Sequence, residues 1–186
     1  MPEIKRCSWG DTDDKLYRKY HDKEWGKLNL DEKYLYEMLV LESFQSGLSW
    51  ATILHKRENF RHAFAEFDVE KVSKFTDADF ERLMNDSGII RNKLKINATI
   101  NNAQVLSNWH QNDKSFSTFL CEFIPNPLIH HFDSESNVPA NNELSAKISK
   151  EMKKQGFKFV GPTTIYSFLQ AVGLINDHIE KCSFKY

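Results

Sequence analysis

Apolar residues recur along the chain at intervals of three and four, the period of an amphipathic α-helix. Residues that start and stop helices bound these segments, such as Asp31 and Ser49 at N-caps and Ser46-Gly47 at an end. No alternating run exceeds the four residues 157–160. The pattern predicts an all-α protein with helices over 32–45, 51–67, 77–84, 91–106, 115–123, 144–155 and 163–173, and a short one after Asp68.

Three prolines among Asn, Ser and His residues predict a single long irregular loop over residues 124–142. The chain has 186 residues and no internal repeat. This length fits one domain or two small lobes that share a core. We expect a single domain spanning residues 1–186.

The composition is that of an ordinary soluble globular protein, with 40% hydrophobic and 27% charged residues. No apolar run reaches the roughly 18 residues that a membrane span requires. The first 15 residues lack the apolar segment of a secretory signal. Three cysteines, an odd number, argue against a disulfide framework. These features predict a cytoplasmic protein without a membrane partner.

The formal net charge of −1 excludes a general electrostatic grip on nucleic acid, so any such contact must be local. Residues 89–112 and 152–176 contain no carboxylate and each carry several basic side chains. On charge alone, we interpret these lysines as the solvated faces of helices rather than as a nucleic-acid surface.

A metal site is the first chemical possibility. His178 and Cys182 are four residues apart, which places them on one face of a helical turn. Cys7 and His21 lie near the other terminus and complete a Cys2His2 set, the ligands of a structural zinc. A zinc ion here would join the two termini. Spacing alone favours the alternative of buried cysteines and capping or surface histidines.

Glu42 is the second candidate. It shares a helix face with Leu35, Met38 and Leu39, so its carboxylate is expected to point inward. A buried carboxylate is costly unless it is paired or recognises a cation. Glu42 could also accept backbone N–H bonds, or lie at the surface beside a narrow apolar stripe. Tyr20, Trp25 and Trp50 could stack a base or could simply belong to the core.

The turn around Gly88 joins two predicted helices. A tight helical hairpin is expected to direct backbone N–H groups and a helix N-terminus outward, where they can bind a phosphate. Helix pairs that end in glycine are common, so this signal alone is weak.

Together these residues make the chain similar to the 3-methyladenine DNA glycosylase I family, within the helix–hairpin–helix glycosylases. The resemblance runs nearly end to end and is weakest over residues 126–142. Its segments are RCSWG (6–10), YHDKEWG (20–26), LESFQSGLSW (41–50), HKREN (55–59), SGIIRNKLKI (87–96) and GFKFVGPTTIYSFLQAVGLINDH (156–178).

The resemblance implies a helical bundle with a helix–hairpin–helix element at about 77–106 and one structural zinc on Cys7, His21, His178 and Cys182. It places the catalytic Glu42 in the base pocket. It also implies that Tyr20 and Trp50 contact the base, with Trp9 and Trp25 close by. The resemblance further implies that Gly47 and Leu48 wedge into the duplex. From the hairpin we expect DNA contacts at Gly88, Ile89 and Arg91.

The implied activity is hydrolytic excision of N3-methyladenine that is flipped out of alkylated double-stranded DNA. The expected products are free 3-methyladenine and an abasic site. The family lacks a catalytic Asp, and nothing indicates a Schiff-base lysine at Lys93 or Lys95, so we expect a monofunctional, monomeric enzyme. The alternatives are a non-catalytic, zinc-stapled protein that binds DNA lesions, and a domain that binds a small cationic metabolite at Glu42.

Overall fold

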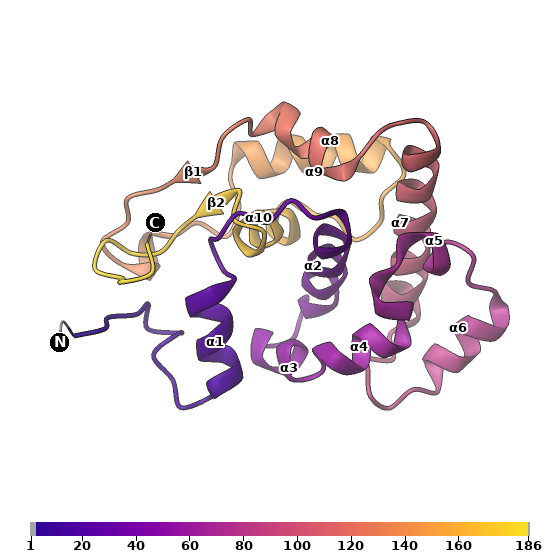
Figure 1. Ribbon diagram of the computed structural model, residues 1–186, viewed down its shortest axis with the longest axis horizontal. Coiled ribbons are helices and arrows are strands. Elements are labelled where there is room, and N and C mark those ends of the chain that lie inside the picture. Colours follow the sequence, from indigo (N-terminus) through magenta and orange to yellow (C-terminus); the bar gives the residue numbers. More distant parts are fainter. Residues whose placement is uncertain (1–2, 186) are drawn as a thin grey trace.

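The computed structural model describes residues 3–185, and almost all of its regular secondary structure is helical (Figure 1), which confirms the predicted helical class. The α-helices are α1 (Lys15–Lys23), α2 (Glu32–Gln45), α3 (Trp50–His55), α4 (Arg57–Ala63), α5 (Val69–Val72), α6 (Asp77–Met84), α7 (Lys93–Gln111), α8 (Phe116–Phe123), α9 (Glu143–Lys154) and α10 (Pro162–Ala171). Two 3-10 turns, η1 (Ala65–Phe67) and η2 (Glu135–Asn137), and two strands complete the fold.

The predicted helix starts are confirmed by their hydrogen bonds. The side chains of Asp31, Ser49, Asp68 and Ser115 each accept a bond from the main-chain N–H three residues later. Each of these caps satisfies one of the N–H groups that a helix start leaves without a partner. Local sequence therefore fixes these four boundaries before any tertiary contact forms.

Two predictions about helices were wrong or incomplete. The helix expected over 51–67 is broken at Lys56, so that it forms α3, α4 and η1. After the break, α4 turns Arg57 into the interior with Phe60, whereas one continuous amphipathic helix over 51–67 would direct Arg57 outward. Helix α1 was missed, although Asp14 caps it by accepting from the N–H groups of Leu16 and Tyr17. It was missed because its many charged residues obscure the apolar periodicity that predicts a helix.

Helix α2 is the centre of the molecule, with α3, α7, α8 and α10 packed around it (Figure 1). Every residue from 35 to 44 is buried. A helix that is buried on all sides is a core helix rather than a surface one. Any charged side chain in this stretch must therefore find a partner or remain in an apolar surrounding.

The long loop over 124–142 is irregular as predicted, apart from η2 and a short strand. This strand, β1 (Leu128–Ile129), pairs in parallel with β2 (Ile175–Asn176), with Leu128 opposite Ile175. The pairing holds the loop against the C-terminal segment, on the side of the molecule where both termini lie (Figure 1). Within residues 3–185, no helix is long and apolar enough to cross a membrane.

Candidate active site and metal centre

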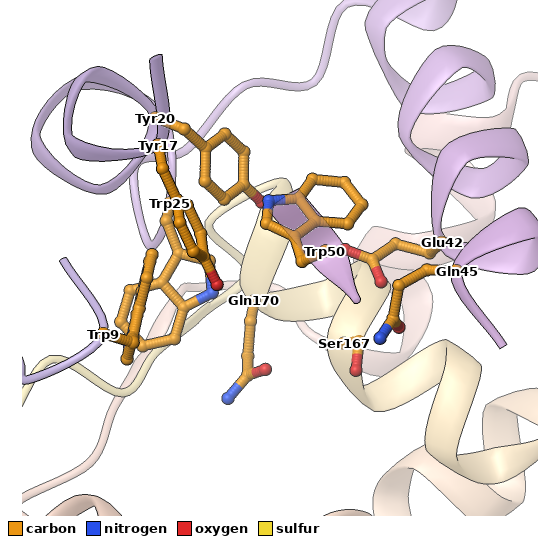
Figure 2. Close-up of a pocket in the computed structure, with 9 residues that line it drawn as sticks. All are labelled: Trp9, Tyr17, Tyr20, Trp25, Glu42, Gln45, Trp50, Ser167 and Gln170. Carbon is orange, nitrogen blue, oxygen red and sulfur yellow. The ribbon is translucent and has the colours of Figure 1, made fainter. Parts of the chain in front are cut away.

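A cavity of about 240 Å³ opens where α1, α2, α3 and α10 meet the segment before α1 (Figure 2). We call it the aromatic pocket, because aromatic rings make up much of its wall. Its lining residues are Trp9, Tyr17, Tyr20, Trp25, Glu42, Gln45, Trp50, Ser167 and Gln170. The structure thus brings together all five residues that the sequence analysis placed in or near a base pocket.

Glu42 enters the pocket from the buried side of α2 and is 6% exposed. Within residues 3–185, no hydrogen bond or ion pair reaches its carboxylate, so the alternative of a carboxylate that accepts backbone N–H bonds is wrong. Burial raises the pKa of Glu42 to about 8. The group is therefore an acid that ionises readily only when a positive charge or N–H donors enter the pocket.

Two other polar atoms of the pocket lack partners among the described residues. The Tyr20 hydroxyl and the Trp50 indole Nε1 are both buried without a hydrogen bond. The two rings lie 5.1 Å apart at an angle of 50°. A buried polar atom without a hydrogen-bond partner costs free energy. A bound ligand could supply the missing partner to each of these two groups.

Trp9 and Trp25 close the other side of the pocket, with their rings 4.9 Å apart and nearly perpendicular. The Tyr17 ring lies 5.4 Å from the Trp9 ring. Aromatic faces attract cations and stack on flat rings. The pocket therefore combines flat aromatic walls, a carboxyl group that can ionise when a cation binds, and two polar atoms without partners. These features suit a small, flat, electron-poor ring with N–H donors.

Four lining residues were missed by the sequence analysis. Tyr17 belongs to the helix that was not predicted. Gln45 lies one helical turn after Glu42, so the periodicity that singled out Glu42 could also have found it. Ser167 and Gln170 lie one turn apart on α10, which carries other polar residues as well, so nothing in the sequence singled them out.

The predicted metal ligands Cys7, His21, His178 and Cys182 are all buried, and their ligand atoms lie within 4.8 Å of one another. The Cys182 sulfur is 3.3 Å from His178 Nδ1 and 3.7 Å from His21 Nε2, and the Cys7 sulfur is 3.6 Å from His178 Nδ1. These separations match a zinc tetrahedron, in which neighbouring ligand atoms are roughly 3.3–3.8 Å apart. We call this group the Cys2His2 cluster.

The outer nitrogen of each histidine has an acceptor, as metal-bound imidazoles usually do. His21 Nδ1 lies 2.8 Å from Asp22, and His178 Nε2 lies 3.0 Å from the carbonyl oxygen of Trp25. Burial lowers the pKa of His178 to about 4, which keeps its imidazole neutral, as a ligand must be. The donor set therefore fits a zinc ion.

The Cys2His2 cluster and the aromatic pocket share a wall. The Trp9 ring lies 4.8 Å from the His21 ring, and the Trp25 ring lies 4.6 Å from the His178 ring. Gly10, which follows Trp9, approaches His21 so closely that a Cβ atom would lie 2.3 Å from the imidazole. The sequence Trp9-Gly10 thus packs one residue against the pocket and the next against a ligand.

The predicted DNA contacts differ in exposure. Gly47, Leu48 and Arg91 are exposed, and Gly47 has a positive φ of 78°, which glycine tolerates best. Ile89 is only 3% exposed, so its side chain belongs to the core. The N–H groups of Gly88 and Ile89 already donate to Asp86. These two N–H groups therefore already have partners within the hairpin.

The interpretation of the basic stretch over 89–112 as a solvated face holds for Arg91 and Lys93, which are exposed, but is wrong for Lys95. Its side chain is buried, and its ammonium donates to the carbonyl oxygens of Phe44 and Ser46, at 2.9 and 2.7 Å. Burial lowers its pKa. The interaction satisfies carbonyls at the C-terminus of α2 and fixes the turn that carries Gly47 and Leu48.

The geometry agrees with comparisons to known proteins. A sequence profile of the methyladenine glycosylase family matches residues 9–186. The chain is 46% identical over 180 residues to DNA-3-methyladenine glycosylase 1 of Escherichia coli (strain K12), covering 96% of each chain. A crystal structure of a 3-methyladenine DNA glycosylase I superposes with a TM-score of 0.93 at 44% identity, covering 96% of this chain and 98% of the other.

A third similar protein is a 3-methyladenine DNA glycosylase I from Staphylococcus aureus, whose structure was determined to explain its recognition of 3-methyladenine. It is 38% identical, with a TM-score of 0.92, and the match covers 100% of this chain and 98% of that one. The likeness therefore extends over the whole chain, including the parts that form the aromatic pocket.

Proposed function

Because the chain belongs to the methyladenine glycosylase family, we propose that it excises 3-methyladenine from alkylated double-stranded DNA by hydrolysis. The reaction leaves free 3-methyladenine and an abasic site. The observation that carries the proposal is the buried carboxylate of Glu42, which has no partner among the described residues and lines a cavity of about 240 Å³ together with aromatic rings.

Adenine methylated at N3 is a ligand that fits the unpaired groups of this pocket. The methylation gives adenine in DNA a formal positive charge, while the exocyclic amine still offers N–H donors. When this base is flipped into the pocket, it favours the ionised form of Glu42, whose carboxylate then pairs with it. Neutral adenine provides no such compensation, so the carboxyl group remains protonated and the gain is smaller.

The rings add to this discrimination. A cation over an aromatic face gains about 0.5–2 kcal/mol, and Trp50 and Tyr20 offer such faces. Their unsatisfied Nε1 and hydroxyl groups supply hydrogen bonds at the rim of the base. We infer that Glu42, Tyr20 and Trp50 bind the base, with Trp9 and Trp25 closing the pocket.

The chemistry requires little from the protein because the cationic base is a good leaving group. When the C1′–N9 bond breaks, its electron pair passes to N9 and neutralises the base, which leaves an oxocarbenium-like sugar. Water adds to C1′ and releases a proton, and the abasic site results. The role that we propose for Glu42 is to stabilise the flipped cationic base and so hold it in position for this cleavage.

The environment of Lys95 supports a monofunctional reaction. A Schiff base requires a neutral amine that can reach the sugar. The Lys95 ammonium is buried and donates to two main-chain carbonyls, so it is not free to attack. Lys93 lies exposed at the start of α7. We therefore expect no adduct to be trapped with borohydride, and a trapped protein–DNA adduct would contradict this part of the proposal.

We also propose that Cys7, His21, His178 and Cys182 hold one structural zinc ion. Zinc would replace the protons of the two thiols and fix the orientation of both imidazoles. Its contribution is to stability, since it joins the two ends of the chain. Through the Trp9 and Trp25 contacts, its ligands would also hold one wall of the pocket.

Elemental analysis tests the zinc proposal, with one equivalent per chain expected. A strong chelator should lower the melting temperature substantially, and Cys7→Ser should do the same. Cys121→Ser is the matched control, because Cys121 lies outside the cluster. Zinc at a small fraction of an equivalent, with equal melting temperatures with and without chelator, would overturn it.

We propose that the remaining DNA contacts come from a helix–hairpin–helix element at about 77–106 and from the exposed Gly47-Leu48 turn, which would enter the duplex beside the flipped nucleotide. Arg91 is an exposed cation of the hairpin. Gly88 and Ile89 would contribute only by shaping its backbone. We expect a single domain that acts as a monomer in the cytoplasm.

The proposal is tested by measuring release of methylated bases from alkylated duplex DNA under single-turnover conditions. We expect the wild type to release 3-methyladenine and leave heat-labile abasic sites, while Trp50→Ala and Glu42→Ala lower the rate by at least tenfold. Tight binding to abasic duplex without release of any base would instead favour the non-catalytic, lesion-binding alternative. Release at the wild-type rate by both variants would show that the pocket assignment is wrong.

A further inference from the structure

A buried carboxylate lies behind the aromatic pocket. Asp177 follows β2 and is 1% exposed. Its Oδ1 accepts a hydrogen bond from His130 Nδ1 at 2.6 Å. Its Oδ2 accepts one from the Tyr166 hydroxyl at 2.6 Å and one from Gln170 Nε2 at 2.7 Å. Three donors therefore converge on a group that the proposed reaction does not use directly.

Of these donors, only Gln170 also lines the pocket. An ionised carboxylate is an acceptor only, so the part of the Gln170 amide that faces Asp177 must be its NH2 group. The side-chain oxygen is then turned away from Asp177. Within residues 3–185, nothing donates a hydrogen bond to this oxygen. Figure 2 shows the amide extending from α10 into the space between Trp9 and Ser167.

The backbone at this position is also fixed. The carbonyl oxygen of Gln170 accepts a hydrogen bond from the Gly26 N–H at 2.9 Å, next to Trp25 of the pocket wall. With the backbone fixed and Nε2 bonded to Asp177, the side-chain amide has little freedom to rotate, and its oxygen remains available to a ligand in the cavity. The charge of Asp177 polarises the amide further, since a hydrogen bond to a charged acceptor is stronger than a neutral one.

Gln45 of α2 also lines the pocket and is also held through its amide nitrogen. Its Nε2 donates to the carbonyl oxygen of Leu48 at 3.1 Å, and no described residue donates to its side-chain oxygen. With Glu42, the pocket then offers three acceptors. An array of fixed acceptors favours a base that is cationic and rich in N–H donors.

We propose that Gln170 is a specificity-determining residue that selects cationic alkylated bases, and that Asp177 is the positioning residue that fixes its orientation. This inference rests on the proposed function, because it concerns the same pocket and the same lesion. The hydrogen bond of Gln170 to a cationic base would be charge-assisted, which corresponds to roughly a 10- to 100-fold effect on the rate.

Two measurements on duplex DNA test the role of Gln170. One is the single-turnover release of 3-methyladenine, and the other is the dissociation constant for a duplex that carries the neutral isostere 3-deaza-3-methyladenine. Gln170→Leu should slow release roughly 10- to 100-fold and change the affinity for the neutral isostere by less than about threefold. Equal losses in both would mean that Gln170 only shapes the cavity and would overturn the inference.

A paired exchange tests the positioning role. Gln170→Glu alone places two carboxylates together and should slow release at least tenfold. Asp177→Asn alone leaves one acceptor oxygen in place of two for the same three donors, so the Gln170 amide is held less firmly and release should slow about three- to tenfold. In the double variant, the new amide at position 177 can donate to the new carboxylate at position 170, so an oriented acceptor returns. The rate should then recover to within about threefold of wild type. A double variant no faster than the slower single variant would contradict the proposal.

The controls separate this inference from the proposed function and from folding. Tyr166→Phe removes another donor to Asp177 without touching the pocket, so it should keep the release rate within about threefold of wild type. Zinc content and melting temperature are measured for each Asp177 variant, because Asp177 precedes the candidate ligand His178. If the wild type released no 3-methyladenine, the proposed function would fail. A wild-type rate in Gln170→Leu would remove only the inference.

Discussion

Glu37 and Glu42 lie on the same helix, five residues apart, and each is 6% exposed. Glu37 accepts hydrogen bonds from Arg57 and Arg61 at 2.8 and 2.7 Å. Arg57 also bonds Glu24 at 2.8 Å. We call Glu24, Glu37, Arg57 and Arg61 the ion-pair cluster. Glu42, by contrast, faces aromatic rings and a cavity.

The two carboxyl groups respond to burial in opposite directions. Burial alone would raise the pKa of Glu37, but the hydrogen bonds and charges of Arg57 and Arg61 bring it below its usual value. The same burial raises the pKa of Glu42 to about 8, since nothing offsets it. Glu37 therefore contributes to the fold, whereas the destabilising environment of Glu42 indicates a function that requires a ligand.

The largest effect is expected when the ion-pair cluster is broken. Glu37→Gln leaves Arg57 buried with one charged partner fewer, which should lower the free energy of unfolding by about 3–5 kcal/mol. Denaturant melts measure this loss. The rate of base release per folded molecule should stay within about threefold of wild type. Loss of release without loss of stability would place Glu37 in the site and remove the contrast with Glu42.

The opposite result is expected for Glu42→Gln. The substitution keeps the shape but removes the charge that pairs with the cationic base. The flipped base should then be populated less, which lowers the release rate by about 30- to 1000-fold. The free energy of unfolding at pH 8 should be equal to that of the wild type or higher. Glu37→Gln is the matched control, and a variant that unfolds as readily as that control would refute the comparison.

Local signals in the sequence could predict much of the fold. Caps such as Asp31 and Ser115 act over three residues, so they can be found without knowledge of the tertiary structure. The break at Lys56 could not be predicted from local sequence. It accompanies an ion pair between Arg57 and Glu37, which lie on different helices. Helix α1 was also not predicted, because its short apolar face of Leu16, Tyr17 and Tyr20 lies among many charged residues.

The site shows the same division. Glu42 was predictable because an acid within an apolar helical stripe violates the pattern. The Cys2His2 cluster combines residues from both termini, and spacing alone did not favour it. Gln170 gave no signal, since its role depends on Asp177 across a turn of the chain. Side-chain orientation of this kind is set by packing rather than by periodicity.

The pH dependence of stability should separate the two glutamates further. Folded Glu42 keeps its proton up to about pH 8, whereas the unfolded group releases it near its usual 4.5. Between these values the folded state binds more protons, so stability falls as pH rises, by at most about 1.4 kcal/mol per pH unit. Comparison of wild type with Glu42→Gln between about pH 5 and 8 measures this slope.

Glu37 should contribute the reverse dependence. Its folded pKa is below its usual value, so its contribution is present above that value and is lost as pH falls through the folded pKa. Glu37→Gln should therefore remove acid sensitivity below about pH 4.5, and Glu42→Gln should remove alkaline sensitivity. If both variants changed stability on the same side of the pH profile, acidic or alkaline, the environments of the two glutamates would not differ as described.

The smallest effect concerns the Tyr20 hydroxyl, which is buried in the pocket that Glu42 also lines, without a partner among the described residues. Tyr20→Phe keeps the ring and removes an unsatisfied polar atom, so the fold should become more stable by up to about 1 kcal/mol. The release rate should fall about three- to tenfold, because a hydrogen bond to the bound base is lost. Tyr36→Phe is the matched control, since that hydroxyl donates to the Thr99 carbonyl at 2.8 Å and its loss should destabilise the fold without slowing release. A Tyr20→Phe variant that is less stable and equally active would show that the hydroxyl serves the fold, like the ion-pair cluster, and not the ligand.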